Sequence, residues 1–197
     1  MGVGQVAAGE RRTDRLFFAL YPEPAAAAAI ARLAGRLQRE LALNGRPIAA
    51  SRLHVTLHFL GSHAGLPPAL VAAALAGAAR IDAPSFDVSF DRVASFAGKD
   101  RERPFVLLGG PGLAALKAFQ RDLGLALAGT DVSGRREPPY VPHVTLLYDD
   151  RSVAEVAVEP VAWRACEFVL VHSFAGQGKH VTLGRWPLRD QAMRTVR

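Results

Sequence analysis

The sequence predicts an α+β protein made of two similar lobes, each with an antiparallel sheet and with helices on its outer side. The first observation behind this prediction is the order of the expected elements: strand, helix and strand occur twice, followed each time by further strands. The second is the tetrapeptide His-Val-Thr-Leu, which occurs at 54–57 and again at 143–146, once in each half. Two sheets facing each other across a central cleft would bring these two copies together.

The elements of the first half follow from apolar periodicity and from residues that start or stop an element. The apolar run at 15–21 ends at Pro22 and indicates a buried strand. Asn44-Gly45 is a plausible helix stop, and Pro67-Pro68 can open a second helix. The predicted elements are a strand at 15–21, a helix at 24–43, the first motif strand at 51–61, a helix at 67–80, and strands at 85–90 and 92–96.

The second half repeats this order. Gly109-Gly110-Pro111 separates an apolar strand from a helix, and a loop rich in Gly, Ser, Asp, Arg and Pro follows that helix at 129–139. The turn Gly176-Gln177-Gly178 separates the last two strands. The predicted elements are a strand at 105–108, a helix at 113–127, the second motif strand at 142–148, and strands at 166–174 and 179–185.

Length and composition favour one folded domain. Of the 197 residues 50% are hydrophobic, so we expect a single bilobal domain at 14–188, preceded by a disordered leader at 1–13 and followed by a flexible tail at 189–197. Because no run of 18 apolar residues occurs and the leader lacks an apolar core, we expect a cytoplasmic protein without a membrane span. We expect a monomer. The single Cys166 excludes an internal disulfide and is expected to be buried.

The net charge is +6 and the isoelectric point is near 10.2, which suits an anionic partner such as RNA. Lysine is scarce while arginine and alanine abound, and a GC-rich genome would produce the same bias without any role in binding. Charge therefore indicates a class of partner and says nothing about the chemistry.

The repeated tetrapeptide predicts a phosphate site. On a strand, alternate side chains share a face and each residue rises about 3.3 Å, so His54 and Thr56 would stand together, as would His143 and Thr145. At neutral pH one imidazole can act as a base while the other acts as an acid. The two threonine hydroxyls can donate hydrogen bonds to non-bridging phosphate oxygens. This scheme needs no metal ion or other cofactor.

The flanking sequence resembles the 2H phosphoesterases, and within them the RNA 2′,3′-cyclic phosphodiesterases also called 2′-5′ RNA ligase-like proteins. The similar segments are 15–20, 53–61, 104–107, 140–148 and 183–188, so the resemblance covers about 15–188. It implies the bilobal fold, hydrolysis of cyclic phosphate ends of RNA or nucleotides to 2′-phosphates, and 2′-5′ end joining as a reverse activity. It also implies that His54 is the acid acting on the departing 3′ oxygen and that His143 is the base acting on water.

The sequence departs from the family pattern at two positions. Many members carry a basic residue five positions after the second histidine and another five before it, where this chain has Tyr148 and Pro138. Arg135 and Arg136 in the preceding loop are therefore candidate substrate-binding residues. Tyr148 is a candidate for stacking on a base, which requires the strand to end or bulge before it.

Two further histidines need an interpretation. His58 shares the face of His54 if the strand alternates strictly, so it is a candidate contact for the nucleotide; a metal site built on this pair lacks a third ligand at a supporting spacing. His180 begins a third His-Val-Thr-Leu, 180 − 143 = 37 residues after the second copy, against 143 − 54 = 89 between the first two. A lobe does not fit in that interval, so we interpret the third copy as a coincidental terminal strand without a catalytic histidine.

Two alternatives to RNA cyclic phosphodiesterase activity remain open. The same site could serve another small substrate, such as a cyclic nucleotide, an ADP-ribose cyclic phosphate or a 2′-5′ oligonucleotide. The chain could also be an RNA-end binding protein that does little chemistry. Turnover of short RNA with a cyclic end, compared with those compounds, would separate these possibilities.

Overall fold

The structure is a computed structural model that describes residues 13–98, 102–128 and 139–190. The α-helices are α1 (Pro24–Glu40), α2 (Pro68–Ala78) and α3 (Ala114–Ala128), with short 3-10 turns at Ala50–Arg52 and Pro111–Leu113. The strands are β1 (Asp14–Leu20), β2 (Val55–His63), β3 (Phe86–Ser95), β4 (Arg103–Leu108), β5 (His143–Asp149), β6 (Val156–Ala165), β7 (Glu167–Phe174) and β8 (Lys179–Pro187). The predicted order of strand, helix and motif strand is confirmed as β1-α1-β2 and as β4-α3-β5.

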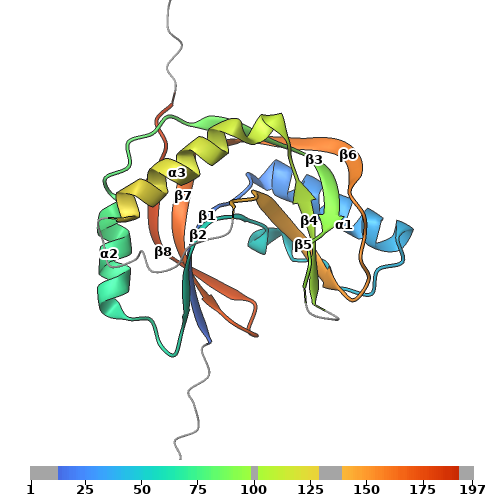
Figure 1. Cartoon of the computed structure of the whole chain (residues 1–197), viewed down its shortest axis with the longest axis horizontal. Helices are drawn as coiled ribbons and strands as arrows, with labels where there is room; N and C mark the ends of the chain where they lie inside the picture. Colours follow the sequence, from blue (N-terminus) through green and yellow to red (C-terminus); the bar gives the residue numbers. More distant parts are fainter. Residues whose placement is uncertain (1–12, 99–101, 129–138, 191–197) are drawn as a thin grey trace, which may run out of the picture.

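The strands form one antiparallel sheet in the order β6-β3-β4-β5-β2-β1-β7-β8 (Figure 1). The α+β class and the two pseudo-symmetric lobes are therefore confirmed, but the two expected sheets are the two halves of a single sheet. They join where β2 and β5 pair, through Val55 and Val144 alone. We call β2-β1-β7-β8 the β2 half and β5-β4-β3-β6 the β5 half. The motif strand of each half lies at this junction, which explains how segments 89 residues apart form one site.

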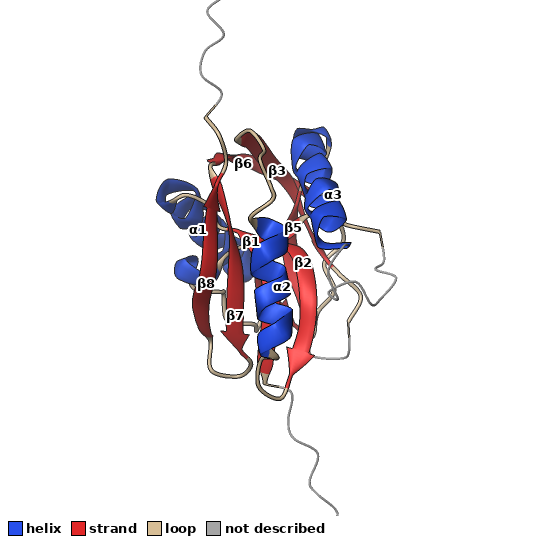
Figure 2. Cartoon of the chain, turned by 90° about the vertical axis from the view of Figure 1, so that its left-hand side faces the viewer, coloured by secondary structure: helices blue, strands red, loops and turns tan. Residues whose placement is uncertain are grey.

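One face of the sheet packs on the helices, and the opposite face is free of them in the described residues. The main core lies on the helix side and includes Leu16 and Phe18 of β1 together with residues of all three helices. A second, smaller apolar cluster lies on the other side of the β2 half, around Phe17 and Val171. Figure 2 shows the helices outside the strands. We call the side with Phe17 the helix-free face.

The β5 half departs from prediction in two elements. The residues expected to form two strands near position 91 are one strand, β3. The neighbouring strand β6 was not predicted; Pro160 lies within it, and proline argues against a strand. Pro160 is accommodated at the sheet edge, opposite the register shift between Phe90 and Arg92. The prediction failed because an edge strand with a bulge tolerates proline, and sequence periodicity does not reveal an edge.

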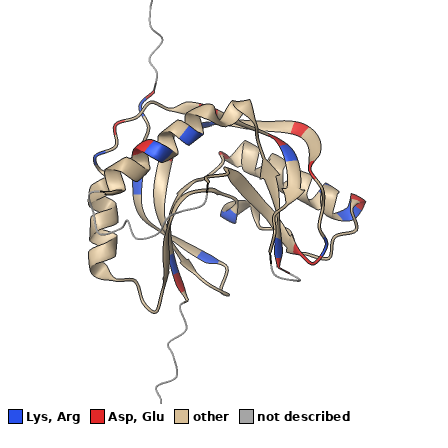
Figure 3. Cartoon of the chain, viewed as in Figure 1, with Lys and Arg blue, Asp and Glu red and all other residues tan. Residues whose placement is uncertain are grey.

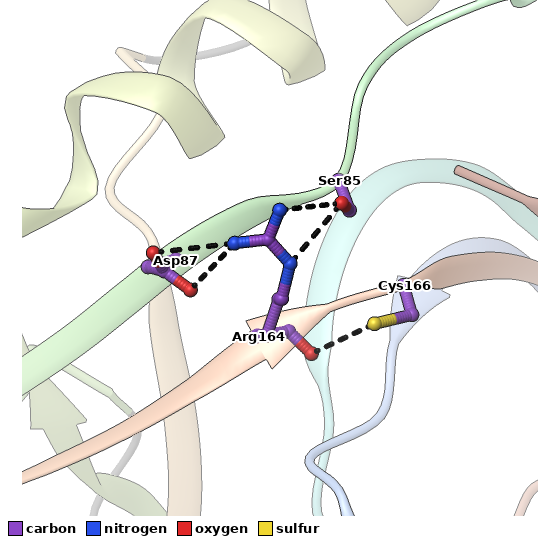
Figure 4. A network of polar contacts seen from close by, with 4 residues as sticks. All are labelled: Ser85, Asp87, Arg164 and Cys166. Atoms are coloured by element: carbon purple, nitrogen blue, oxygen red, sulfur yellow. Dashed lines mark hydrogen bonds and ion pairs between the residues drawn. The ribbon is translucent and has the colours of Figure 1, made fainter. Parts of the chain in front are cut away.

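Polar contacts fasten β6 to β3 (Figure 4). The Arg164 guanidinium donates to Ser85 Oγ at 2.8 and 3.2 Å and lies 3.4 Å from a carboxylate oxygen of Asp87. Cys166 follows this strand, and its thiol donates to the Arg164 carbonyl at 3.7 Å. Cys166 is exposed, so the expectation that it is buried is wrong.

The end of the described chain is tied to the domain. Leu188 is buried, and Arg189 exchanges backbone hydrogen bonds with Ala83 and Ser85 at 2.9 and 2.7 Å. Leu188 and Arg189 are therefore held against the domain. The residues of the expected flexible tail from 191 on, and those of the expected leader at 1–12, lie outside the described residues. Within the described residues, no helix is long and apolar enough to cross a membrane.

Candidate active site

His54 and His143 occupy equivalent positions at the starts of the two motif strands. His54 directly precedes β2, and its Nδ1 donates to the Arg52 carbonyl at 2.7 Å. His143 is the first residue of β5, and its Nδ1 donates to the Val141 carbonyl at 2.8 Å. A carbonyl only accepts, so each Nδ1 carries a proton in either charge state. The Nε2 of each ring is therefore the atom that can exchange a proton with a substrate.

The junction of the two halves brings the four predicted polar residues together. Val55 and Val144 pair in antiparallel register, and both are buried on the helix side. Their flanking residues consequently point to the other face. In this register, the neighbours of Val55 lie beside those of Val144 in reverse order: Thr56 beside His143, and His54 beside Thr145. Each motif histidine thus stands across the junction from the threonine of the opposite motif.

Each motif strand carries an extra residue at the leucine of its tetrapeptide. In β2, Phe18 pairs with His58 and the next residue of β1, Ala19, pairs with Thr56, which leaves Leu57 as the extra residue. In β5 the same shift leaves Leu146 as the extra residue. A bulge of this kind reverses the alternation of faces beyond it. The residue five positions after each histidine therefore returns to the face of that histidine.

These bulges determine on which face two of the residues expected to contact the substrate lie. Tyr148 lies beyond the second bulge on the face of Thr145, 49% exposed, as the stacking hypothesis required. His58 lies beyond the first bulge on the helix side, where its Nε2 donates to the Gln120 carbonyl of α3 at 2.7 Å. The expectation that His58 faces the nucleotide is therefore wrong, because strict alternation does not hold past Leu57.

Phe59, which the sequence reasoning missed, is the counterpart of Tyr148 in the β2 half. It pairs with Phe17, so it lies on the helix-free face, and it is also 49% exposed. A large aromatic side chain left half in solvent next to each motif is suited to stacking on a nucleobase. The signal in the sequence was its equal spacing: both aromatics stand five residues after a motif histidine.

The surroundings of the two histidines differ. The ring of His54 stacks on Phe17 at 5.0 Å between centroids, and Tyr21 and His180 lie at 6.1 and 5.4 Å. His143 has one aromatic neighbour within the described residues, the edge-on ring of Phe96 at 4.9 Å. His54 therefore sits in an aromatic cage.

Electrostatics follow this difference. Burial lowers the pKa of His54 below its usual value; the hydrogen bond to the Arg52 carbonyl opposes this, and the charges of His143 and Arg52 lower the pKa further. Burial also lowers the pKa of His143, against its hydrogen bond to Val141. The charge of His143 therefore opposes protonation of His54.

The third His-Val-Thr-Leu is a terminal strand as predicted, but it is not remote from the site. His180 is the second residue of β8, after Lys179, and its ring lies 5.4 Å from that of His54. Its Nδ1 is 3.1 Å from the Tyr21 hydroxyl. Spacing along the chain could not show this. The pairing of β8 with β7 brings the start of β8 into contact with Phe17, through the ring of His180.

The described residues do not bear on every predicted contact. Arg135, Arg136 and Pro138 lie outside them. Lys and Arg residues occur on helices and strands of both halves, so net charge does not locate the site (Figure 3). Within residues 13–98, 102–128 and 139–190, no group of three or more His, Cys, Asp or Glu side chains is placed to hold a metal ion.

Two imidazoles and two hydroxyls at the junction of paired half-sheets define the class of phosphoesterases named for their two histidine motifs. The chain belongs to the 2'-5' RNA ligase superfamily, whose family model matches residues 22–175. The resemblance drawn from the motifs is therefore confirmed at the level of the superfamily. No curated protein sequence matches the chain.

Solved structures support the same assignment. The chain is similar to E. coli LigT in its apo form, with 28% identity, a TM-score of 0.67, and coverage of 90% of this chain and 98% of that one. It is also similar to E. coli LigT complexed with 3'-AMP, with 27% identity, a TM-score of 0.65, and coverage of 89% and 98%. The protein TT0787 of Thermus thermophilus shares the fold, with 21% identity, a TM-score of 0.68, and coverage of 90% and 100%.

Proposed function

We propose that this protein hydrolyses 2′,3′-cyclic phosphate ends of RNA or nucleotides to 2′-phosphates, and that it joins 2′-5′ ends when a 5′ hydroxyl takes the place of water as the nucleophile. The observation that carries the proposal is the arrangement at the Val55–Val144 junction. Two imidazoles with their Nδ1 atoms tied to carbonyls expose two Nε2 atoms, and each motif histidine stands across the junction from the threonine of the opposite motif. One phosphodiester between them meets an acid, a base and two donors.

In this mechanism the base removes a proton from water as it attacks phosphorus, and the acid protonates the departing ribose oxygen on the opposite side. The two hydroxyls hold the non-bridging oxygens in line and stabilise the charge that develops on them. Water enters, one P–O bond breaks, and the net proton transfer is from water to the 3′ oxygen. The two imidazoles exchange charge states in each turnover and are reset through solvent.

The family resemblance makes His54 the acid and His143 the base. In the free protein burial and the charges of His143 and Arg52 lower the pKa of His54, which disfavours the protonated form that an acid needs. The assigned roles therefore require the bound phosphate to raise the pKa of His54, as an anion beside an imidazolium does. The pH profile of kcat/KM reports the free protein and that of kcat reports the complex, so the pKa of the acid is expected to be higher in kcat.

A direct test uses a short RNA with a 2′,3′-cyclic end, incubated with the protein in excess chelator. The expected result is a 2′-phosphate product, formed at the rate measured without chelator. A 3′-phosphate product would reverse the orientation of the substrate. Loss of activity in chelator and its return with a divalent cation would replace this mechanism with a metal-dependent one.

A small nucleotide is the second candidate substrate. The structures of E. coli LigT include complexes with 3'-AMP, ATP and NADP+. The exposed Phe59 and Tyr148 offer two stacking surfaces, enough for one or two bases. Comparison of kcat/KM for cyclic mononucleotides and for cyclic-ended oligonucleotides decides between the two.

A further inference from the structure

The third His-Val-Thr-Leu repeats the backbone pattern of the two motif strands. In the pairing of β7 with β8, Leu170 pairs with Gly184, and the next residue of β7, Val171, pairs with Thr182. Leu183 of β8 is therefore an extra residue, at the same place in the tetrapeptide as in the two motif strands. The residue five positions after the histidine is Arg185, which pairs with Val169 of the helix-free face. On the helix-free face, β8 presents three polar residues. We call this set the β8 face; it consists of His180, Thr182 and Arg185.

Arg52 reaches the β8 face from the segment that precedes β2. A Cβ added to Gly178, in the turn between β7 and β8, would come within 2.7 Å of Nη1 of Arg52, so the guanidinium lies against that turn. Its Nε is buried and has no hydrogen-bond partner within the described residues. An orphaned buried donor on a cation is costly, and an anionic ligand would satisfy it.

His180 and Tyr21 complete the surroundings. Their hydrogen bond is 3.1 Å long, and burial raises the pKa of the Tyr21 phenol, so this hydroxyl stays protonated and can donate to Nδ1. Nε2 of His180 then carries the proton and can donate in turn. Burial and the charges of His54 and Arg52 lower the pKa of His180 to about 4, so at neutral pH this ring is a neutral donor and not an acid catalyst.

We propose that Arg52 and the β8 face form a second anion subsite, beyond His54 on the side away from His143, which binds a second phosphate of the substrate. This inference rests on the proposed function and extends it: the preferred substrate carries a phosphate on the 5′ side of the ribose that bears the cyclic phosphate. In RNA that group is the preceding internucleotide phosphate.

The geometry supports this ligand over a second reacting centre. His180 has no counterpart of the junction that places Thr145 beside His54, because β8 pairs only with β7 in the described sheet. Its position beside His54 is therefore that of a binding group adjacent to the reacting phosphate. Arg185 also forms an ion pair with Glu167, which leaves Arg52 as the subsite cation without a carboxylate partner in the described residues.

The test uses three substrates that differ only at the 5′ position: a nucleoside 2′,3′-cyclic phosphate, the same compound with a 5′-phosphate, and the methyl ester of that 5′-phosphate. The methyl ester mimics an internucleotide phosphate, and the free 5′-phosphate mimics a mononucleotide. The readout is the ratio of kcat/KM with and without the 5′ group, measured for the parent protein, Arg52→Gln, His180→Gln and the control Arg36→Gln. Arg36 is an exposed arginine of α1 that pairs with Glu40.

We expect the 5′ group to lower KM and thereby to raise kcat/KM. Arg52→Gln and His180→Gln should each reduce the ratio of kcat/KM with and without the 5′ group by about tenfold, the scale of a charged hydrogen bond. Arg36→Gln should keep it. A general disturbance of His54 would slow all three substrates alike and leave the ratio unchanged. A preference for the methyl ester would indicate RNA, and a preference for the free 5′-phosphate a mononucleotide.

A parent protein that hydrolyses the substrates without any preference, or a preference that survives both substitutions, would overturn the subsite. If none of the substrates turns over, the proposed function fails and the subsite is judged separately by calorimetry. Nucleoside 2′,5′-bisphosphate should then bind more tightly than nucleoside 2′-phosphate, and Arg52→Gln should abolish the difference. Equal affinities would exclude the subsite.

Discussion

The β2 half and the β5 half present the same motif in different surroundings. Both histidines donate from Nδ1 to the carbonyl two residues earlier, both motif strands bulge at the tetrapeptide leucine, and both place a half-exposed aromatic five residues after the histidine. His54 is caged by Phe17, Tyr21 and His180, whereas His143 has the edge of Phe96. The backbone is therefore pseudo-symmetric and the electrostatics are not.

This difference shows how nearly symmetric motifs can take different roles. Burial lowers the pKa of both rings, and the charges of His143 and Arg52 lower that of His54 further. A bound phosphate raises the pKa of each ring according to how close it lies to that ring. Equivalent substitutions in the two halves should thus have similar effects where the two halves share the same backbone arrangement, and different effects where the surroundings of the residues differ.

The largest effect is expected from removal of either imidazole. His54→Ala and His143→Ala should each lower kcat by about 10² to 10⁴-fold, the scale of general acid or base catalysis. A substrate whose 3′ leaving group needs no protonation should rescue His54→Ala more than His143→Ala, because only the base is then required. Steady-state rates with both substrates measure this. Equal rescue of the two variants would contradict the assignment of acid and base.

Removal of either hydroxyl should have a smaller effect. Thr56→Val and Thr145→Val keep the shape of the side chain and lose one donor to a charged oxygen, worth about 1.5 to 3 kcal/mol, or about tenfold to a hundredfold in kcat/KM. The backbone carbonyl of Thr56 also accepts a hydrogen bond from Tyr140 at 3.1 Å, which both variants leave intact. Thermal unfolding serves as the control for folding. Wild-type kinetics in either variant would remove that hydroxyl from the site.

The two aromatics should affect substrate binding. Phe59→Ala and Tyr148→Ala each remove a surface for base stacking, worth about 1 to 3 kcal/mol per base, and should raise KM with little change in kcat. Leu125 of α3 is an exposed apolar residue on the helix side, so Leu125→Ala is a matched control. If only one aromatic matters, the substrate presents a single base to the site. If neither does, the shared spacing is structural.

The smallest effect concerns stability against pH. In the unfolded chain the three motif histidines titrate near 6.5, and in the folded protein the pKa of each is lowered. The unfolded state then binds more protons below pH 6.5, so stability is fully present above that pH and is lost as pH falls toward about 4. Thermal unfolding between pH 7.5 and 5 measures this. His180→Gln should flatten the dependence, and an unchanged slope would show that His180 does not contribute.

The sequence alone was sufficient for the class of fold, for the order of strand, helix and motif strand in each half, and for the expectation that His54, His143 and their threonines lie together. These depend on local patterns: apolar periodicity, turn residues and a repeated tetrapeptide with distinctive flanks. Strand β6 marks the limit of such patterns, because the tolerance for Pro160 depends on its place at a sheet edge and not on its neighbours in the chain.

Only the tertiary structure decided which other residues join the site. A bulge shifts the alternation by one residue, which moved His58 to the helix side and Tyr148 and Phe59 to the helix-free face. Strand pairing places His180, which is distant in the chain, beside His54. Arg52 lies close by, and its Nε has no hydrogen-bond partner among the residues that the structure describes. Spacing in the sequence measures separation along the chain, whereas a site depends on distances in space. Strand pairing and bulges determine those distances, and neither can be read from the spacing.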